Sequence, residues 1–266
     1  MTPKDKASLL SEWFMTRGKV IVAFSGGVDS GVLAAAARKT LGTNALAITA
    51  DSSTMPRREL EDAIKLAREI GIAHEVIKED ELEDSRFVEN PPERCYFCRS
   101  RLAEALKRIA EARGFSTIVD GANASDLEEH RPGLKALKEQ GIESPLLELG
   151  FTKKDVREIA AYFNLRVEQK PSQACLASRI PYGEIITRDR LRAVERAEDF
   201  LLSLGFSQVR VRSHGNIARI ELPENEIPRA IEFRRKISEK LEALGFSYIT
   251  LDLKGYRSGS MDEVLQ

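Results

Sequence analysis

The sequence predicts an α/β protein in which a doubly wound parallel β-sheet is followed by a smaller C-terminal α+β domain. Three observations lead to this prediction. Short β-branched runs alternate with helical patterns over the first two thirds of the chain. A glycine-rich turn joins the first expected strand to the first expected helix, and from about residue 187 the alternation changes. Such βαβ repetition places ligands at the carboxyl ends of the parallel strands.

The elements of the first part follow from its apolar runs and turn residues. Lys19–Phe24 is a short β-branched run that suits a strand buried on both faces, and the Ala-rich stretch 28–41 suits a helix. Pro56 fits the first turn of a helix that ends near Ile70, before Gly71. The other expected elements are strands at 45–51, 73–78 and 116–120, helices at 96–113 and 152–162, and a segment at 145–149.

The second part begins with an expected helix over 187–204. Two short strands of alternating polarity, 208–213 and 217–222, follow it, and a helix over 225–243 and a strand over 247–253 complete the pattern. This predicts a small α+β domain with an antiparallel sheet. The predicted domains are therefore residues 1–170 and 187–260, with 171–186 as a connection that carries Cys175.

The composition narrows the classes of function. The 266 residues carry a net charge of −1 with both signs interspersed, so no global field favours a nucleic acid or an anionic membrane. The N-terminal stretch lacks the apolar core of a signal peptide, and no window reaches the roughly 18 apolar residues of a membrane helix. We therefore expect a cytoplasmic protein with no membrane partner.

The strongest local signal is Ser25-Gly26-Gly27-Val28-Asp29-Ser30, between the first strand and its helix. Two adjacent glycines let the backbone approach a ligand without a Cβ in the way, and the helix N-terminus offers free N–H groups. Ser25 and Ser30 add hydroxyl donors, and Asp29 is a candidate ligand for Mg²⁺. The alternative is an ordinary βα turn with a serine N-cap. The absence of GxxxxGK[ST] and GxGxxG excludes the usual ATPase and dinucleotide motifs.

The cysteines are Cys95, Cys98 and Cys175. The first two form a CxxC pattern at the start of an expected helix, where both sulfurs lie on one side. Such a pair serves as a redox pair, half of a zinc site or half of an iron–sulfur site. Three cysteines fall short of a closed zinc site, whereas three thiolates on a 4Fe-4S cluster leave one iron open for a substrate atom. Unconnected buried thiols are the plainer alternative, since one sequence does not show that Cys175 meets the other two.

The SGGVDS run in this position resembles the PP-loop of the ATP pyrophosphatases, which have an adenine nucleotide alpha hydrolase-like fold. The resemblance implies ATP and Mg²⁺ as cofactors, and an enzyme that adenylates a carboxylate, amide or carbonyl oxygen and releases pyrophosphate. Asp51-Ser52, at the end of the second strand, match the place where such proteins contact adenosine, although an ordinary strand-end cap is the alternative. The residues that the resemblance assigns to pyrophosphate and Mg²⁺ are Ser25, Gly26, Gly27, Asp29 and Ser30.

Further distinctive stretches cover nearly the entire chain. They are the CxxC followed by Arg99, residues 121–126 with 131–133, and residues 174–187, 209–212, 214–215, 218–221 and 255–260. Together with SGGVDS they resemble the LarE family, the ATP-dependent sulfur transferases of nickel-pincer nucleotide biosynthesis. The C-terminal stretches separate this family from other PP-loop enzymes.

The resemblance implies a reaction on pyridinium-3,5-biscarboxylic acid mononucleotide, whose carboxylates are adenylated and then become thiocarboxylates. In some members the cysteine that matches Cys175 gives up its own sulfur and becomes dehydroalanine. Other members, with three cysteines, carry a 4Fe-4S cluster whose open iron holds the transferable sulfide. Because this chain adds Cys95 and Cys98 to Cys175, we favour the cluster, with all three cysteines as ligands and Cys175 at the sulfur-transfer position.

The phosphate and carboxylates of this substrate need basic side chains. Arg210 and Arg212 alternate on one strand face and are candidates for a phosphate fork, the alternative being a solvated strand face. Arg179 and Glu221 are further candidates for substrate binding. Glu198 is a further candidate for catalysis, beside Asp29 and Cys175.

Other classes of protein compete with this reading. A tRNA-thiolating enzyme also joins a PP-loop to cysteine-bound clusters, but it needs a basic surface, which a net charge of −1 does not favour. An amidating enzyme of the NAD or GMP synthetase type needs ammonia and leaves the CxxC unexplained. A nucleotide-binding or redox-sensing module would not release pyrophosphate. We expect a small-molecule nucleotide substrate and a homo-oligomer, while the sulfide donor does not follow from the sequence.

Overall fold

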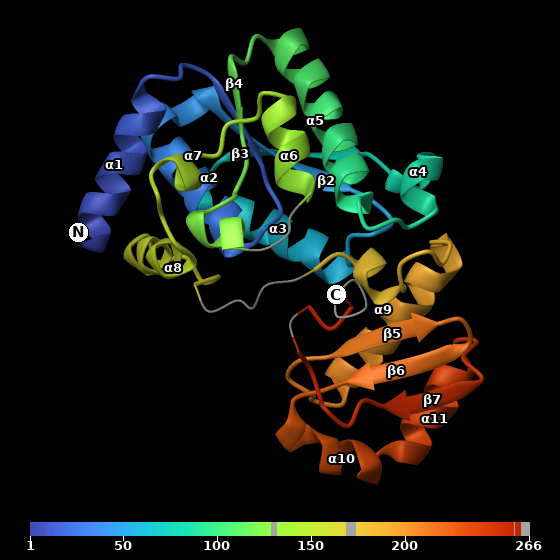
Figure 1. Ribbon diagram of the computed structural model, residues 1–266. Helices are drawn as coiled ribbons and strands as arrows, with labels where there is room; N and C mark the ends of the chain where they lie inside the picture. Colours follow the sequence, from blue (N-terminus) through green and yellow to red (C-terminus); the bar gives the residue numbers. More distant parts are fainter. Residues whose placement is uncertain (129–131, 169–173, 258, 262–266) are drawn as a thin grey trace. The chain divides into compact units, whose positions relative to one another are not determined.

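The computed structural model describes residues 1–128, 132–168, 174–257 and 259–261 (Figure 1). The chain forms two compact units. The first comprises Met1–Glu81 and Glu93–Gln173, and the second comprises Leu82–Pro92 and Ala174–Gln266. The second unit thus includes a short stretch from the first half of the chain, which the sequence did not predict. Arg131, and residues 171–173 of the predicted connection, lie outside the described residues.

The first unit contains a sheet of four parallel strands, which confirms the predicted sheet. Each strand lies where the sequence predicted one. The two middle strands have apolar residues that are buried on both faces of the sheet, as expected for a parallel sheet covered by helices. In spatial order the strands are β3 (Ala73–Lys78), β2 (Ala45–Asp51), β1 (Val20–Ala23) and β4 (Thr117–Val119).

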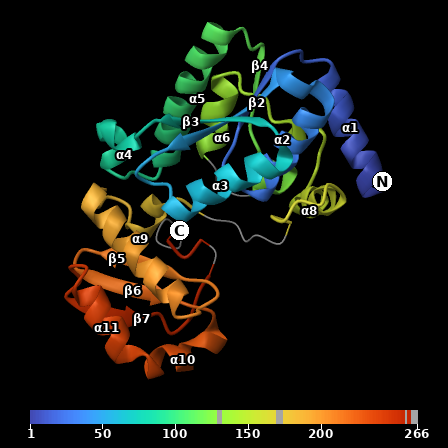
Figure 2. The same ribbon diagram turned by 180° about the vertical axis from the view of Figure 1, so that it is seen from behind.

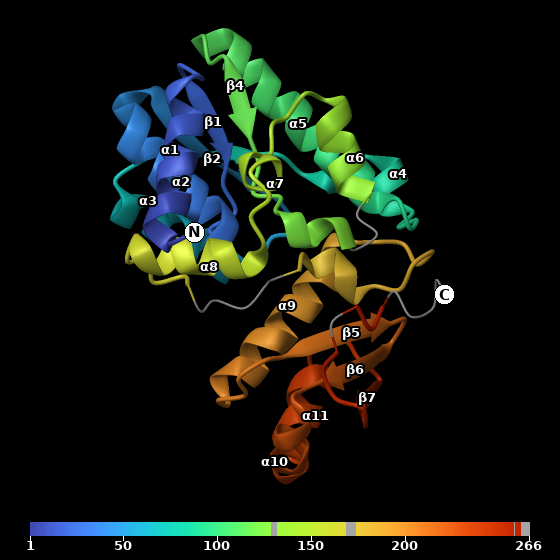
Figure 3. The same ribbon diagram turned by 60° about the vertical axis from the view of Figure 1, so that its left-hand side comes forward.

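Helices cover both faces of this sheet, as the three ribbon views show (Figure 1, Figure 2 and Figure 3). Each face packs into a separate apolar cluster, so the sheet is doubly wound. On one side lie α1 (Pro3–Met15), α2 (Val28–Leu41), α3 (Arg57–Ile70) and α8 (Lys153–Tyr162). On the other side lie α5 (Arg94–Arg113) and α6 (Pro132–Glu139).

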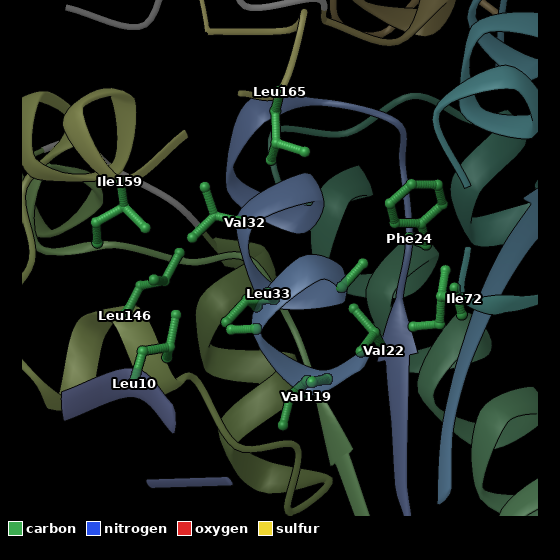
Figure 4. Packing of buried hydrophobic residues seen from close by; sticks show 14 of the residues in the cluster. Leu10, Val22, Phe24, Val32, Leu33, Ile72, Val119, Leu146, Ile159 and Leu165 are labelled. Atoms are coloured by element: carbon green, nitrogen blue, oxygen red, sulfur yellow. The ribbon is translucent and has the colours of Figure 1, made fainter. Parts of the chain in front are cut away.

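The alternation of side chains along β1 separates the two clusters. Val22 packs with Leu33 of α2 and Ile159 of α8 in the larger cluster (Figure 4). Ile21 points the other way and packs with Leu106 of α5. This packing fixes the β1–α2 junction from both sides, and that junction carries the predicted phosphate loop.

Several elements were not predicted. No type of element was predicted for the segment 145–149, where the short helix α7 (Pro145–Glu148) lies. Neither α1 nor α6 was expected, nor was α4 (Ser85–Val88). The short 3₁₀ turns are η1 (Gly42–Asn44), η2 (Glu81–Glu83), η3 (Ala124–Glu128), η4 (Leu176–Arg179) and η5 (Glu224–Glu226).

Asp155 connects α1 to α8. Its carboxylate accepts a hydrogen bond from the N–H of Thr152, the N-cap of α8, and the Thr152 hydroxyl accepts one from the N–H of Asp155. The same carboxylate forms an ion pair with Lys6 of α1. Burial raises the pKa of Asp155, but the hydrogen bonds from Lys6 and Thr152 outweigh burial and lower the pKa to about 2.

Asp155→Asn is expected to lower the free energy of unfolding by about 1 kcal/mol at pH 7, because it weakens the cap and removes the ion pair. A carboxylate in an unfolded chain has a pKa of about 3.9, so the stabilisation is complete above that pH and is lost as the pH falls through about 2. Urea unfolding of both proteins between pH 2 and pH 7 measures the difference, with Glu111→Gln as an exposed control. A difference that stays constant with pH would contradict this assignment.

The second unit contains three strands, β5 (Arg210–His214), β6 (Ile217–Glu221) and β7 (Tyr248–Leu251), in that order. β5 and β6 are antiparallel as predicted, but β7 is parallel to β6, so the prediction of an antiparallel sheet is wrong for the third strand. Two helices lie between β6 and β7 in the chain, and such a crossover returns the chain in its original direction.

The helix expected over 225–243 is divided into α10 (Ile227–Glu232) and α11 (Arg234–Glu242). Phe233 separates them with φ −84° and ψ 4°, and its ring packs edge-on against Phe206. The helix expected over 187–204 is confirmed as α9 (Arg188–Ser203), which begins after the N-cap Thr187. Among the described residues, no helix is both long enough and apolar enough to cross a membrane.

The two faces of the second sheet differ in polarity. Val211 and Ile220 pair across the apolar face. Arg210 pairs with Glu221, and Arg212 pairs with Arg219, on the opposite face. These charged side chains are not a solvated strand face, because Arg210, Arg212 and Glu221 are all buried.

Asn90 explains why residues 82–92 belong to the second unit. It is fully buried and has a positive φ of 57°, a conformation that asparagine tolerates better than most residues. Its side-chain amide donates to the backbone oxygen of Pro181 at 2.7 Å, and also to those of Ile180 and Glu184 at 3.2 Å. Its own backbone oxygen accepts from the N–H of Gly183 at 2.9 Å.

Candidate active site

The loop between β1 and α2 leaves the N-terminus of α2 open. Gly27 is the N-cap of α2 and has no side chain that can bond the first N–H groups of the helix. The Ser30 hydroxyl connects two parts of the loop, since it donates to the Gly27 oxygen and accepts from the Ser25 N–H, both at 3.2 Å. The Ser25 hydroxyl lies 3.2 Å from that of Ser30. Open N–H groups with two adjacent hydroxyls suit an anion such as pyrophosphate.

The first glycine of the loop is required by packing as well as by backbone conformation. Gly26 has a φ of +73°, and a Cβ there would lie only 2.7 Å from the Cα of Ala63 in α3. The close approach that the sequence attributed to a ligand is therefore also an approach to α3. Gly27 has an ordinary φ of −83°, and its place at the N-cap is what keeps the helix end uncovered.

Asp29, in the first turn of α2, has partners on both carboxylate oxygens. Oδ2 pairs with the ammonium of Lys153, the first residue of α8, and Oδ1 accepts from the Asn123 amide at 3.2 Å. Asp29 remains partly exposed. A cation that binds this carboxylate therefore competes with the Lys153 ammonium.

The sequence did not identify Asn123, Ser125 or Lys153 as site residues. The loop after β4 brings them to Asp29, because the Lys153 N–H donates to the Ser125 hydroxyl at 3.1 Å and the Ser125 N–H donates to the Asn123 side chain at 3.0 Å. β1 and β4 are neighbours in the sheet, so both loops lie at the same carboxyl edge, where the strand order reverses. Gly121 is the residue that could have indicated this close approach of the two loops, because a Cβ at this position would lie 3.1 Å from the Asp29 Cβ.

Asp51 and Ser52 lie at the carboxyl end of β2, as predicted. The Asp51 carboxylate pairs with the guanidinium of Arg57, which also donates to the Ser52 oxygen at 2.7 Å. The buried Ser52 hydroxyl lies 3.3 Å from the Thr54 hydroxyl. The contact with adenosine stays a prediction.

The CxxC pair occupies the first turns of α5, with Cys95 exposed and Cys98 half-buried. The Cys98 thiol lies 3.5 Å from the buried carboxyl of Glu81, which also accepts from the Thr54 hydroxyl at 3.1 Å. Burial raises the pKa of Glu81, although these hydrogen bonds favour its carboxylate form. A chain of polar contacts thus joins Ser52 to Cys98 through Thr54 and Glu81, and the sequence did not predict it.

In the second unit, Cys175 is exposed and directly precedes the turn η4. The guanidinium of Arg179, at the end of that turn, is fully buried and donates to the backbone oxygens of Ala174 at 2.8 Å and Cys175 at 3.1 Å. It forms a two-pronged ion pair with the fully buried Glu198 of α9, at 2.8 and 3.1 Å. Arg179 and Glu198, predicted as separate site residues, are thus one pair beneath Cys175.

Each member of this pair stabilises the ionised form of the other. Burial raises the pKa of Glu198, but Arg179 outweighs burial and lowers it. Burial likewise lowers the pKa of Arg179, but Glu198 raises it overall. The pair is therefore ionised in the folded protein.

Arg210 and Arg212 lie on one strand face, as predicted, but they have protein partners. Arg212 donates to Glu221 at 2.8 Å, to the Ser178 oxygen at 2.9 Å and to the Ser260 hydroxyl at 3.0 Å. The Arg210 guanidinium lies over the ring of Tyr256, 5.4 Å from its centroid, and burial lowers its pKa. The Glu221 carboxylate is fully buried and also accepts from Ser260. Binding of substrate phosphate by these residues stays a prediction.

Cys95 and Cys98 belong to the first unit and Cys175 to the second. Within the described parts of the chain, no three His, Cys, Asp or Glu side chains are grouped to hold a metal ion. Two thiols one helical turn apart, as Cys95 and Cys98 are, suit a single thiophilic centre.

Comparisons with known proteins show which families and proteins this chain is similar to. Residues 12–90 match the NAD synthase family, a range that includes the loop SGGVDS. A protein described as uncharacterized, from Synechocystis sp., is 44% identical over 98% of both chains. Another such protein, from Methanocaldococcus jannaschii, is 33% identical over 94% of both chains.

The pyridinium-3,5-bisthiocarboxylic acid mononucleotide synthase of Lactiplantibacillus plantarum is 40% identical to this chain, over 93% of this chain and 90% of the synthase. The match therefore extends through both units, including the phosphate loop, the Cys175 turn (Cys175 with the turn η4 that follows it) and the arginines of β5. On this evidence the chain belongs to the LarE family of PP-loop enzymes.

Proposed function

We propose that this protein is an ATP-dependent sulfur transferase, which adenylates carboxylates of pyridinium-3,5-biscarboxylic acid mononucleotide and converts them to thiocarboxylates for nickel-pincer nucleotide synthesis. One observation carries the proposal: an open phosphate loop stands in a chain that matches, over 93% of its length, a synthase of the bisthiocarboxylic product. The Cys175 turn supports it, because it presents a thiol from a fixed backbone.

The first half-reaction uses the first unit. A carboxylate oxygen of the substrate attacks the α-phosphorus of ATP, the bond to the β-phosphate bridging oxygen breaks, and pyrophosphate leaves. The N–H groups of α2 with Ser25 and Ser30 hold the pyrophosphate. Asp29 would hold Mg²⁺ once its carboxylate has separated from Lys153. The freed ammonium of Lys153 then balances phosphate charge. The product is an acyl adenylate, which has AMP as a good leaving group.

The second half-reaction brings sulfur to the activated carbon. A sulfur nucleophile attacks the acyl carbon, the bond to the AMP oxygen breaks, and AMP departs. A 4Fe-4S cluster bound by Cys95, Cys98 and Cys175 would supply a sulfide for this attack. In the alternative, the Cys175 thiolate attacks, its Cα loses a proton and its Cβ–S bond breaks, leaving dehydroalanine and a thiocarboxylate.

The setting of the reaction belongs to the same proposal. We place it in the cytoplasm, because three cysteines in 266 residues give no disulfide framework and a thiol-dependent reaction needs reducing conditions. The homo-oligomer stays a prediction. A nucleic-acid substrate is not favoured by the net charge of −1.

Asp29→Asn is expected to lower the rate of substrate-dependent pyrophosphate release by about 10²- to 10³-fold, because a neutral amide holds Mg²⁺ poorly at the phosphates. The measurement uses ATP labelled at the α- and γ-phosphates, and we expect equal amounts of AMP and pyrophosphate. Asp189→Asn, in the first turn of α9, is the matched control. ADP and inorganic phosphate as products would refute the pyrophosphatase assignment.

The match to the NAD synthase family makes an amidating enzyme the competing candidate. The same assay separates the two when ammonia replaces the sulfur source. Mass spectrometry of the nucleotide product then shows either an amide or a thiocarboxylate. Formation of the amide would favour the amidating enzyme.

A further inference from the structure

We propose that Arg179 is a positioning residue that holds Cys175 in place and joins its turn to the strand of Arg210 and Arg212, rather than a residue that contacts substrate. The proposal rests on the proposed function, because it gives Cys175 a part in sulfur transfer. It also changes the role that the sequence predicted for Arg179.

The contacts of Arg179 leave no surface for a substrate. The side chain is fully buried, and each of its guanidinium nitrogens donates within the protein. Nε and Nη2 donate to the two oxygens of Glu198, at 2.8 and 3.1 Å. Nη1 donates to the oxygens of Ala174 and Cys175, and to the Ser178 hydroxyl at 2.9 Å.

These contacts fix the backbone of Cys175 while its side chain stays exposed. The Cys175 oxygen accepts from Arg179 at 3.1 Å, from the Ser178 N–H at 3.0 Å and from the Ser178 hydroxyl at 2.8 Å. The Ala174 oxygen, one residue earlier, accepts from the same guanidinium nitrogen. The backbone is thus held on both sides of the Cys175 Cα, which fixes the direction of its Cα–Cβ bond.

The same pair ties this turn to β5. Glu198 Oε1, which accepts from Arg179, also accepts from the N–H of Val211 at 3.0 Å. Val211 lies between Arg210 and Arg212, and Arg212 in turn donates to the Ser178 oxygen at 2.9 Å. Two routes of hydrogen bonds therefore join the Cys175 turn to the strand of the two arginines. The thiol and the predicted phosphate-binding residues form parts of one rigid body.

The Arg179–Glu198 pair is better explained by the positioning of Cys175 than by a contribution to the stability of the fold. A buried ion pair contributes little net stability, because both charges are removed from water. An error of about 1 Å in the position of a reacting group costs roughly 10²-fold in rate. A fully buried fork that bonds two backbone oxygens beside the reacting residue meets that need for precision.

The test is Arg179→Lys, which keeps the charge but cannot make the forked contacts. Hydrogen–deuterium exchange of the full chain, read by mass spectrometry on peptides that cover residues 174–180, is expected to be at least about tenfold faster than in the wild type. Pyrophosphate release is expected to stay within about twofold, while thiocarboxylate formed per pyrophosphate falls at least about tenfold. A merely structural role would lower both half-reactions together.

Arg229→Lys is the matched control, because Arg229 also donates to loop oxygens, those of Leu204 and Gly205, elsewhere in the same unit. It is expected to leave exchange at residues 174–180 and the coupling of the half-reactions unchanged. Glu198→Gln keeps the side-chain shape and repeats the exchange measurement on residues 174–180 if Arg179→Lys does not fold.

Three outcomes decide the proposal. Unchanged exchange with unchanged coupling would overturn it. A tenfold rise in the KM for the nucleotide with intact coupling would return Arg179 to substrate binding and overturn it as well. If the wild type releases no pyrophosphate, the proposed function fails, and the exchange of residues 174–180 still decides whether Arg179 holds the turn.

Discussion

Replacing Cys175 with alanine is expected to abolish thiocarboxylate formation, by at least about 10³-fold, while pyrophosphate release continues. The loop proposed to hold pyrophosphate lies in the first unit, whereas Cys175 lies in the second. Cys175 is exposed, and the alanine side chain leaves the hydrogen bonds of its backbone oxygen in place. Parallel assays of pyrophosphate and of thiocarboxylate in the same reaction measure the separation.

Cys95→Ala then distinguishes the two sources of sulfur. If a cluster carries the sulfide, this variant loses thiocarboxylate formation and bound iron together, and Cys175 keeps its mass after turnover. Glu104→Ala, an exposed residue further along α5, is the control. Anaerobic iron and sulfide counts with mass spectrometry of the Cys175 peptide give the answer. An active Cys95→Ala protein in which Cys175 loses one hydrogen sulfide per product would show that the cysteine is consumed.

The parallel sheet of the first unit could be predicted because its signals are local. The run Val20–Phe24 is apolar at every position, as expected of a strand buried on both faces. The direction of β7 could not be predicted in this way, because its alternating residues suit a parallel and an antiparallel neighbour equally. The assignment of residues 82–92 to the second unit depends on Asn90, whose bonding partners lie about 90 residues further along the chain.

The residues of the candidate site also differ in whether the local sequence could identify them. Asp29 and Ser30 belong to a contiguous motif, so the sequence identified them. Lys153 reaches Asp29 from 124 residues away, and nothing in its local sequence distinguishes it from Lys154. Arg179 was predicted to bind substrate, and that role stays a prediction. Its full burial against Glu198, 19 residues further along the chain, could not be predicted from its neighbours in sequence.

Arg212 combines two roles that a single substitution disturbs together. Its guanidinium, which is almost fully buried, faces the fully buried carboxylate of Glu221, and it also bonds the Ser178 oxygen in the Cys175 turn. Removing the arginine leaves Glu221 without its main counter-charge in a buried site. Arg219, 3.2 Å from Glu221, is a more exposed partner and can compensate only in part.

Arg212→Ala is therefore expected to lower the free energy of unfolding of the second unit by about 3–5 kcal/mol, the usual cost of breaking a buried ion pair from one side. Arg212→Ala combined with Glu221→Ala is expected to be less destabilising than the sum of the two single variants, because no unpaired buried charge remains. Arg219→Ala, the matched control on the same strand pair, is expected to cost about 1 kcal/mol or less. Urea unfolding of the four variants against the wild type measures these differences.

The variant Arg212→Ala also tests whether Arg212 binds substrate. If Arg212 holds the phosphate of the mononucleotide, Arg212→Ala weakens substrate binding by at least about tenfold at a temperature where the variant is folded, while ATP binding in the first unit is unchanged. Isothermal titration with each ligand separates the two effects, since loss of folded protein reduces the number of binding sites without changing their affinity. Unchanged affinity for the mononucleotide in the folded variant would show that Arg212 supports the Cys175 turn and Glu221 and takes no part in binding the phosphate.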